Sequence, residues 1–201
     1  MTYDYHVSSE NKTGYNSPLI TNDTLNIVES ANYWVQGGMP RCKIVIGFAT
    51  YGKTERHGFK LANPNSKDVS VGAPASSPAN ATQFVQSPGD AAYFEFCEMI
   101  AKGAKDHYDP IAQAPSLIQK GEWFSYDNVK SFKKKLKWLK SQAFGGAFVW
   151  ALDYDDFNGK CTGNKDGIYP LIGTIARLLG KFKRPLVSVA DIIKAKNLKN
   201  N

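Results

Sequence analysis

The stretch FVWALDYDDF at residues 148–157 says most about the fold of this chain. It starts as an apolar, aromatic run that favours a strand, and it then opens into the acids Asp153, Asp155 and Asp156. A strand that delivers the flat indole of Trp150 beside carboxylates suits a pyranose ring, because sugar C–H groups pack against a π face while hydroxyls bond to the acids. The stretch therefore predicts a sugar site at the end of a strand.

Two other short apolar runs end in residues of the same kind. Residues 1–6 are expected to form a strand that carries Tyr3 and Asp4, and residues 43–50 are expected to form a buried strand that leads to Tyr51. A helix predicted between them, from about residue 23, completes a β-α-β unit, which is typical of α/β proteins with a parallel sheet. The further predicted elements are a helix over 91–102, a Lys-rich helix over 130–140, a strand over 146–152 and a helix over 170–179.

These runs belong to a set of blocks that resembles glycoside hydrolase family 18, the chitinases and chitinase-like lectins. The order and spacing of the blocks are similar to those of the C-terminal half of that family over roughly residues 1–175. The blocks are MTYD at 1–4, SPL at 17–19, GMP at 38–40 with KIVIGF at 43–48, YG at 51–52, AYFEFC at 92–97, WFSYDN at 123–128 and the stretch 145–157.

The resemblance implies an α/β fold: the C-terminal part of a (β/α)8 TIM barrel, with about three strand-helix units and an inserted small α+β domain. A complete barrel takes about 250 residues, so the 201 residues of this chain cannot close one while also holding the insertion. We therefore expect the complete enzyme to need an N-terminal half of the barrel. The expected division is a barrel segment at 1–52, the insertion domain at 53–126, a second barrel segment at 127–180 and a basic tail at 181–201.

The family hydrolyses chitin, the β-1,4-linked polymer of N-acetylglucosamine, by a substrate-assisted mechanism in which the acetamido oxygen of the sugar attacks its own anomeric carbon. Its general acid is the final Glu of an Asp-x-x-Asp-x-Asp-x-Glu run. The nearest string in this chain, from Asp153 to Asp156, lacks that Glu. The resemblance thus implies a chitinase-family chain that is inactive alone. The alternatives are a lectin that binds chitin without cleaving it and a degenerate product with neither activity.

The resemblance also assigns roles to single residues. Tyr3 would donate its hydroxyl to the acetamido group, Asp4 would bond the same sugar, and Trp150 would form the floor on which the ring stacks. Three further residues, Met1, Tyr51 and Glu95, match positions that line the cleft, and Lys53, also expected to bind substrate, stands where the family frequently has an Arg. The plainer interpretations are a core aromatic for Trp150 and ordinary strand-end residues for Tyr3 and Asp4. For Tyr51 the alternative is a packing role, and for Glu95 it is a place on the surface.

Two loops depart from the family pattern. After Met-x-Tyr-Asp the family usually continues His-Gly-x-Trp, whereas this chain reads HVSS at residues 6–9. The block after Tyr-Gly also differs, with Glu55 in place of the usual aromatic. Both departures fall on loops expected to face the sugar, and we expect them to weaken its binding.

Three cysteines allow one disulfide and one free thiol. In the family, cysteines at the places of Cys97 and Cys161 pair, which leaves Cys42 free. Three Asn-x-Ser/Thr strings are candidate glycosylation sites: Asn11, Asn22 and Asn80. Such strings also occur by chance. Together these features favour an extracellular, secreted protein whose signal peptide is not in this chain, since the chain starts without an apolar leader.

The densest basic cluster of this chain, whose net charge is +7, is the predicted helix at 130–140. Apolar residues recur at helical spacing on one of its faces, with Lys133, Lys137 and Lys140 opposite, so we expect a solvated lysine face. A nucleic-acid surface is disfavoured because no stacking aromatics interleave with these lysines. The sequence has no apolar stretch near the ~20 residues of a membrane span, and no metal or cofactor is expected. Chitin or chito-oligosaccharides are the expected partners.

Overall fold

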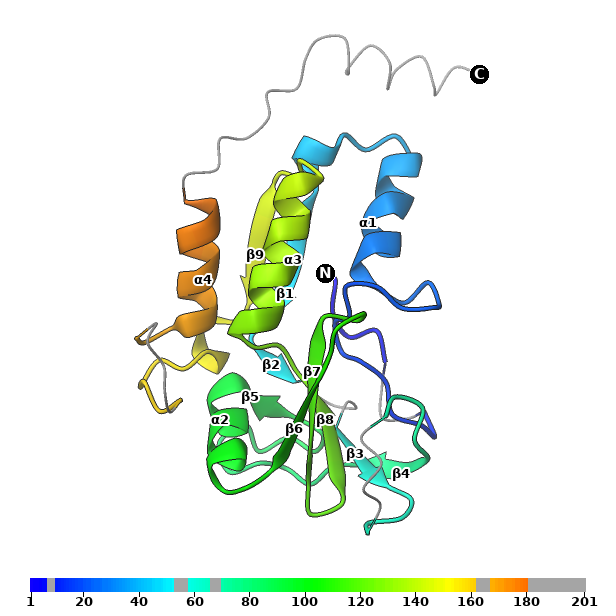
Figure 1. Ribbon diagram of the computed structural model, residues 1–201, viewed down its shortest axis with the longest axis vertical. Coiled ribbons are helices and arrows are strands. Elements are labelled where there is room, and N and C mark those ends of the chain that lie inside the picture. The colour runs from blue at the N-terminus through cyan, green and yellow to red at the C-terminus, as the bar shows by residue number, and fades with distance from the viewer. Residues whose placement is uncertain (7–9, 53–57, 66–69, 162–166, 181–201) are drawn as a thin grey trace.

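A computed structural model describes residues 1–6, 10–52, 58–65, 70–161 and 167–180 (Figure 1). The candidate Lys53, most of the departure at residues 6–9, Glu55 and the basic tail at 181–201 lie outside the described residues. Within the described ranges, no helix is both long and apolar enough to cross a membrane.

The first region is built on two parallel strands, here called the parallel pair. Strand β1 (Val45–Ala49) pairs with β9 (Gly146–Trp150), in a register that sets Ala49 beside Trp150. Helices α1 (Ile27–Gln36), α3 (Val129–Ser141) and α4 (Pro170–Leu179) lie around the pair in the upper part of Figure 1. Short 3-10 turns precede β1 at Arg41–Lys43 and follow β9 at Leu152–Tyr154.

The second region is a five-stranded antiparallel sheet in the lower part of Figure 1. Helix α2 (Tyr93–Ala101) lies beside it, and the short strands β2 (Tyr51–Gly52) and β5 (Ala91–Ala92) pair between the two regions. In spatial order the five strands are β4 (Ala75–Pro78), β3 (Gly58–Leu61), β8 (Glu122–Ser125), β7 (Ala114–Gln119) and β6 (Lys105–Asp109).

One hydrophobic core runs through both regions. A single cluster of buried side chains contains residues of α1, β1, α3 and α4 as well as residues of α2 and β8. Phe48 of β1 packs edge-on against Phe132 of α3, with ring centroids 4.9 Å apart. A disulfide joins Cys97 on α2 to Cys161 after β9, the pairing that the resemblance implies, and Cys42 is a free thiol. The architecture is thus mixed α/β, and the described residues do not form a closed barrel.

The strand predicted for residues 1–6 is wrong, because no strand of the described chain pairs with this segment. It is held instead by single bonds: the Thr2 hydroxyl donates to the Gly47 carbonyl at 2.7 Å, and the Tyr5 amide donates to the Asn16 carbonyl at 3.2 Å. Asp4 has a φ of 66°, in the left-handed region, which an extended strand does not allow.

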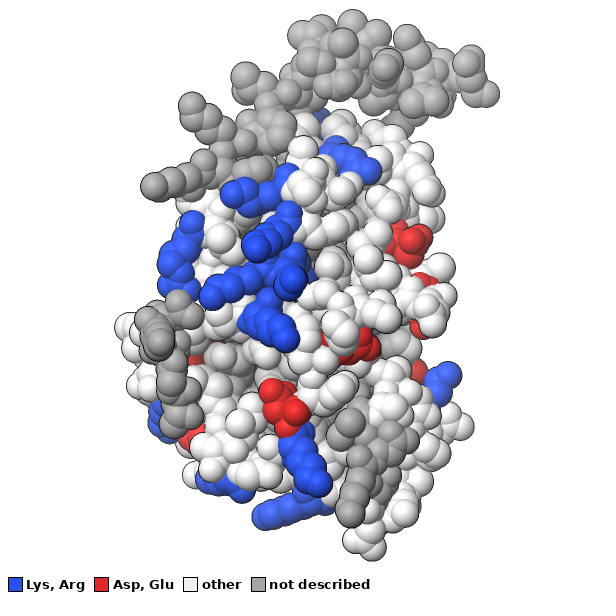
Figure 2. Space-filling model, viewed as in Figure 1, with Lys and Arg blue, Asp and Glu red and all other residues white. Residues whose placement is uncertain are grey.

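Other predicted elements hold with shifted ends. Helix α1 begins at Ile27 rather than near residue 23, because the side chain of Asn26 accepts the Glu29 amide proton at 2.9 Å and caps the helix. Strand β9 ends at Trp150, two residues earlier than predicted, and it is half-exposed. The lysines of α3 that were expected in solvent are exposed and gather over this helix in Figure 2, but Lys135 is buried.

Candidate functional site

The candidate site lies where β1 and β9 end. Since parallel strands present their carboxyl ends at one edge, Tyr51 and Trp150 emerge close together there. The Thr50 amide donates to the Trp150 carbonyl at 3.1 Å, and the Trp150–Ala151 peptide bond is cis. The Trp150 side chain is 53% exposed, so within this chain it is not the core aromatic of the plainer interpretation.

An aromatic cluster made of Tyr3, Tyr51, Phe148 and Tyr154 packs beside this strand end. The ring of Tyr3 meets Tyr51 edge-on at 5.9 Å and Phe148 at 6.2 Å. Tyr154, from the turn after β9, meets Tyr51 at 5.7 Å. Gly47 makes room for this packing, because a Cβ there would lie 2.8 Å from the Phe148 ring and 2.9 Å from the Tyr3 ring. The cluster brings together three segments that are far apart in sequence.

Asp4 is the charged member of the site. The Tyr51 hydroxyl donates to Oδ1 of Asp4 at 3.0 Å, and the Asp4 amide donates to Oδ1 of Asn16 at 3.0 Å. Burial, together with the charge of Asp4, raises the pKa of Tyr51, so that its hydroxyl stays protonated and remains a donor. The ring of Tyr51 is therefore packed, and its hydroxyl orients the Asp4 carboxylate, while its contact with sugar stays a prediction.

The hydroxyl of Tyr3 is buried and, among the described residues, has no hydrogen-bond partner. Tyr3 is 6% exposed, and burial, with a smaller contribution from the charge of Asp4, raises the pKa of its hydroxyl. The group is therefore protonated at neutral pH and is free to donate. A buried polar group without a hydrogen-bond partner destabilises a folded protein by about 1–3 kcal/mol. A ligand that accepted a hydrogen bond from this hydroxyl would remove that cost.

Glu95, expected at the cleft, is engaged elsewhere. Its carboxylate accepts three hydrogen bonds, each 2.9 Å long, from the Thr82 hydroxyl, the Phe84 amide and the Ala92 amide. It thereby caps the start of α2 and holds the preceding loop. Because it is buried, the alternative of a surface acid is wrong, while its contact with sugar stays a prediction.

The remaining predicted residues are more dispersed. Met1 is highly exposed, and the three candidate glycosylation asparagines, Asn11, Asn22 and Asn80, lie on the surface, where a glycan has room. A separate groove of about 340 Å³ on α1 is lined by Glu29, Tyr33, Trp34 and neighbouring residues, none of which belongs to the aromatic cluster. Within the described ranges, no group of three or more His, Cys, Asp or Glu residues could hold a metal ion.

Sequence reasoning missed several residues of this site, above all Asn16, whose side chain contacts the backbones of both Asp4 and Tyr51. A signal was present, since Asn16 directly precedes the block SPL at 17–19. Phe148 and Tyr154 lie inside the stretch 148–157, but nothing in their spacing showed that they would pack against Tyr3 and Tyr51.

Comparison with known proteins gives this geometry a family. The profile described as "Glycosyl hydrolases family 18" matches residues 1–155. The chain belongs to glycosyl hydrolase family 18. It is 43% identical over 187 residues to the "Probable endochitinase" of Caenorhabditis elegans, which covers 90% of this chain and 29% of that protein. It is 39% identical over 189 residues to human "Chitinase-3-like protein 2", covering 90% of this chain and 46% of that protein.

Solved structures of family 18 proteins agree with the fold. The immunomodulatory active chitinase of Trichuris suis superposes with a TM-score of 0.84 at 41% identity, over 90% of this chain and 50% of that one. Human YKL-39, solved with chitooligosaccharides (GlcNAc4), gives a TM-score of 0.80 at 39% identity, again over 90% and 50% of the two chains. The chain thus spans about half the length, or less, of these family 18 relatives.

Proposed function

We propose that this chain forms the sugar-binding half of a chitinase-type active site, with an N-acetylglucosamine unit of chitin as its ligand. The observation that carries the proposal is the buried Tyr3 hydroxyl, which is protonated and unpaired among the described residues. Beside it lie the carboxylate of Asp4 and, at the neighbouring strand end, the open indole of Trp150. A donor, a carboxylate and an exposed aromatic face are the groups that an acetamido sugar requires.

In the proposed mechanism, the Tyr3 hydroxyl donates a hydrogen bond to the acetamido group and steadies the charge that develops there. Asp4, oriented by Tyr51, bonds the same sugar, and Trp150 supports the ring. The acid that protonates the leaving oxygen is not among the 201 residues, which contain no Asp-x-x-Asp-x-Asp-x-Glu run. We therefore propose that hydrolysis needs a second segment that carries this run.

The same second segment would complete a (β/α)8 barrel, to which β1 and β9 contribute two strands. Further strands would pair with the open edges of β1 and β9, as the strands of a closed barrel do. By this proposal, residues 53–126 form the inserted domain, and the protein works outside the cell. The disulfide supports that location, because disulfides persist in oxidising compartments.

A lectin that binds chito-oligosaccharides without cleaving them is the second candidate. It is favoured by the likeness to YKL-39, which is described as "a pseudo-chitinase with retained chitooligosaccharide binding properties". Both candidates use the same residues of this chain. They differ in whether the partner segment ends its acidic run in Glu.

Reconstitution tests the proposed enzyme. The purified chain is mixed with the N-terminal half of the Caenorhabditis elegans relative, and release of a fluorophore from a chitobioside is measured. We expect no turnover from the chain alone, because general acid catalysis contributes about 10²- to 10⁴-fold in rate. We expect turnover from the mixture, and its loss when the final Glu of the acidic run is changed to Gln.

Two further variants make this test specific. Tyr3→Phe removes only the hydroxyl and should reduce turnover by the mixture, whereas Tyr33→Phe, on the exposed face of α1, should leave it unchanged. Turnover by the chain alone that Tyr3→Phe abolishes would contradict the proposal, since it would mean that this chain contains its own acid.

A further inference from the structure

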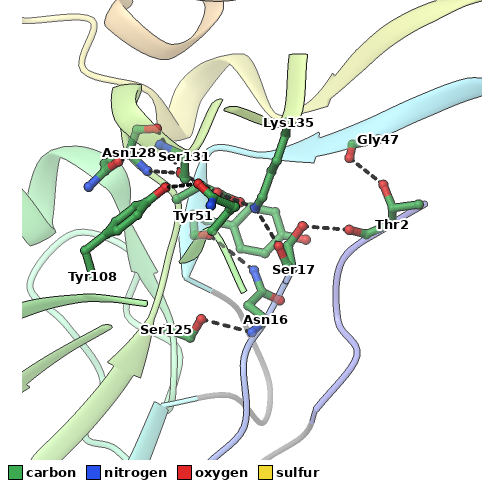
Figure 3. A network of polar contacts seen from close by, with 12 residues as sticks. Thr2, Asn16, Ser17, Gly47, Tyr51, Tyr108, Ser125, Asn128, Ser131 and Lys135 are labelled. Atoms are coloured by element: carbon green, nitrogen blue, oxygen red, sulfur yellow. Dashed lines mark hydrogen bonds and ion pairs between the residues drawn. The ribbon is translucent and has the colours of Figure 1, made fainter. Parts of the chain in front are cut away.

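The loop at residues 16–17 lies beside Tyr51 of the candidate site and is buried there (Figure 3). Oδ1 of Asn16 accepts the amide proton of Asp4 at 3.0 Å, and its Nδ2 donates to the carbonyl of Tyr51 at 3.4 Å. The carbonyl of Asn16 also accepts the amide proton of Tyr5 at 3.2 Å. One asparagine therefore bonds to the backbone at Asp4 and Tyr51, whose side chains meet in the site, and to the residue after Asp4.

Ser17 holds the same opening segment on the other side of Tyr3. Its hydroxyl donates to the Thr2 carbonyl at 2.7 Å, and the Thr2 hydroxyl donates in turn to the Gly47 carbonyl of β1 at 2.7 Å. These two bonds link Ser17 through Thr2 to β1 (Figure 3).

The loop is itself anchored to the five-stranded sheet and to α3. Oγ of Ser125 on β8 accepts the Asn16 amide proton at 3.0 Å. Nζ of Lys135 on α3 donates to the Ser17 carbonyl and to Oδ1 of Asp127, both at 2.5 Å. The Lys135 side chain is 1% exposed, so its ammonium depends on these two oxygens in place of water.

Resting on the proposed function, we propose that Asn16 and Ser17 are positioning residues, which hold Tyr3, Asp4 and Tyr51 in their sugar-binding arrangement and which Lys135 anchors to α3. Asp4 adopts a left-handed backbone conformation, which costs free energy for any residue other than glycine, although less for aspartate than for most, and which surrounding bonds stabilise. The Asn16 side chain supplies such a bond at the Asp4 amide, and Ser17 supplies a second one two residues earlier.

Asparagine variants at two positions test this role. Asn16→Ala removes both side-chain bonds to the site. Asn26→Ala is the matched control, because both asparagines are 1% exposed, and each accepts one backbone amide proton and donates to one backbone carbonyl. Hydrogen exchange at the amides of Asp4 and Tyr5 and the affinity of the chain for chitotetraose are measured for each variant. Asn16→Ala should speed exchange at these two amides at least tenfold more than Asn26→Ala does, and it should weaken binding by about 3- to 10-fold.

A second pair of variants keeps the test decisive if Asn16→Ala does not fold. Ser17→Val and Ser17→Thr introduce side chains of the same shape, but only threonine keeps a hydroxyl that can donate to the Thr2 carbonyl. We expect Ser17→Thr to preserve slow exchange at residues 3–5 and the affinity, and Ser17→Val to lose both.

The outcomes separate this inference from the proposed function. Unchanged exchange at Asp4 and Tyr5 in Asn16→Ala, or equal behaviour of the two Ser17 variants, would overturn the positioning role, as would faster exchange with unaltered affinity. Wild-type protein that binds no chitotetraose would instead contradict the proposed function, while the exchange data would still decide whether Asn16 and Ser17 hold the segment.

Discussion

The five-stranded sheet and the parallel pair differ in how far each completes its own structure. In the sheet, β3, β8 and β7 have neighbours on both sides, and Trp123, Phe124 and Leu117 are almost fully buried. In the parallel pair, β1 and β9 have only each other among the described strands, and β9 is half-exposed along its length. The sheet buries its apolar residues within this chain, whereas the parallel pair leaves strand edges open to further strands. The candidate site lies on the open region.

The two regions are nevertheless joined at specific points. Lys135 of α3 donates both to the Ser17 carbonyl and to Oδ1 of Asp127, which lies two residues after β8, and the disulfide ties α2 to the segment after β9. If these junctions hold the open region in shape, their removal should destabilise the chain far more than changes on its surface.

The largest effect is expected at the buried ion pair. Asp127→Ala leaves the ammonium of Lys135 without its counter-charge and should lower the free energy of unfolding by about 3–5 kcal/mol. Urea denaturation measures it. Lys133→Ala, on the exposed face of the same helix, should stay within about 0.5 kcal/mol of wild type. Adding Lys135→Met to Asp127→Ala should recover much of the loss. If Asp127→Ala alone were as stable as wild type, this junction would not hold the two regions together.

The disulfide is the second junction. Its partners are 64 residues apart, and in the chain-entropy model a cross-link of this span stabilises by about 4 kcal/mol. Replacing both Cys97 and Cys161 by Ala should therefore lower the midpoint of unfolding strongly, whereas Cys42→Ala should change it little. Peptide mapping under non-reducing conditions checks the pairing, and a bond to Cys42 would contradict it.

A smaller effect is expected from Tyr5, which ties the opening segment to α1 through a 2.6 Å bond to the Ser30 hydroxyl. Burial raises the pKa of Tyr5 to about 12, although that bond opposes the rise. The folded state therefore retains the proton longer than the unfolded state, so stability falls as the pH rises from about 10 to 12, by about 2 kcal/mol.

Unfolding measured between pH 9 and 12 checks this prediction. Tyr5→Phe should reduce the decline, and Tyr33→Phe, which changes an exposed tyrosine on α1, should not. An equal decline in all three proteins would mean that residues 1–6 are not packed against α1 in solution.

Local signals predicted most of the elements. Helix α4 was predicted with its observed bounds, because Pro170 suits a first helical position and the apolar residues that follow keep one face. Local signals could not show that residues 1–6 form no strand, because strand formation depends on a second strand that pairs with the segment. The start of α1 was predicted near residue 23 rather than at Ile27, because only the bond from the Glu29 amide to the Asn26 side chain shows which residue caps the helix.

The site divides in the same way. Trp150 and Asp4 could be found because they follow apolar runs and match family blocks. The residues that hold this site in place could not be found from the sequence, because the Lys135 ammonium bonds to the carbonyl of Ser17, 118 residues earlier in the chain. A hint existed in the spacing of Phe132, Lys135 and Leu139, which places this lysine on the apolar face of α3.

The central claim is that the open end of the parallel pair binds sugar through Trp150. Titration calorimetry with chitotetraose tests it on the wild-type chain, on Trp150→Ala and on Trp34→Ala. The two tryptophans are 53% and 59% exposed, so Trp34, on α1, controls for the loss of an exposed indole. We predict that Trp150→Ala weakens binding by about 1–3 kcal/mol, while Trp34→Ala leaves the affinity unchanged. Equal affinities of the wild-type chain and Trp150→Ala, or an equal loss in both variants, would contradict the account.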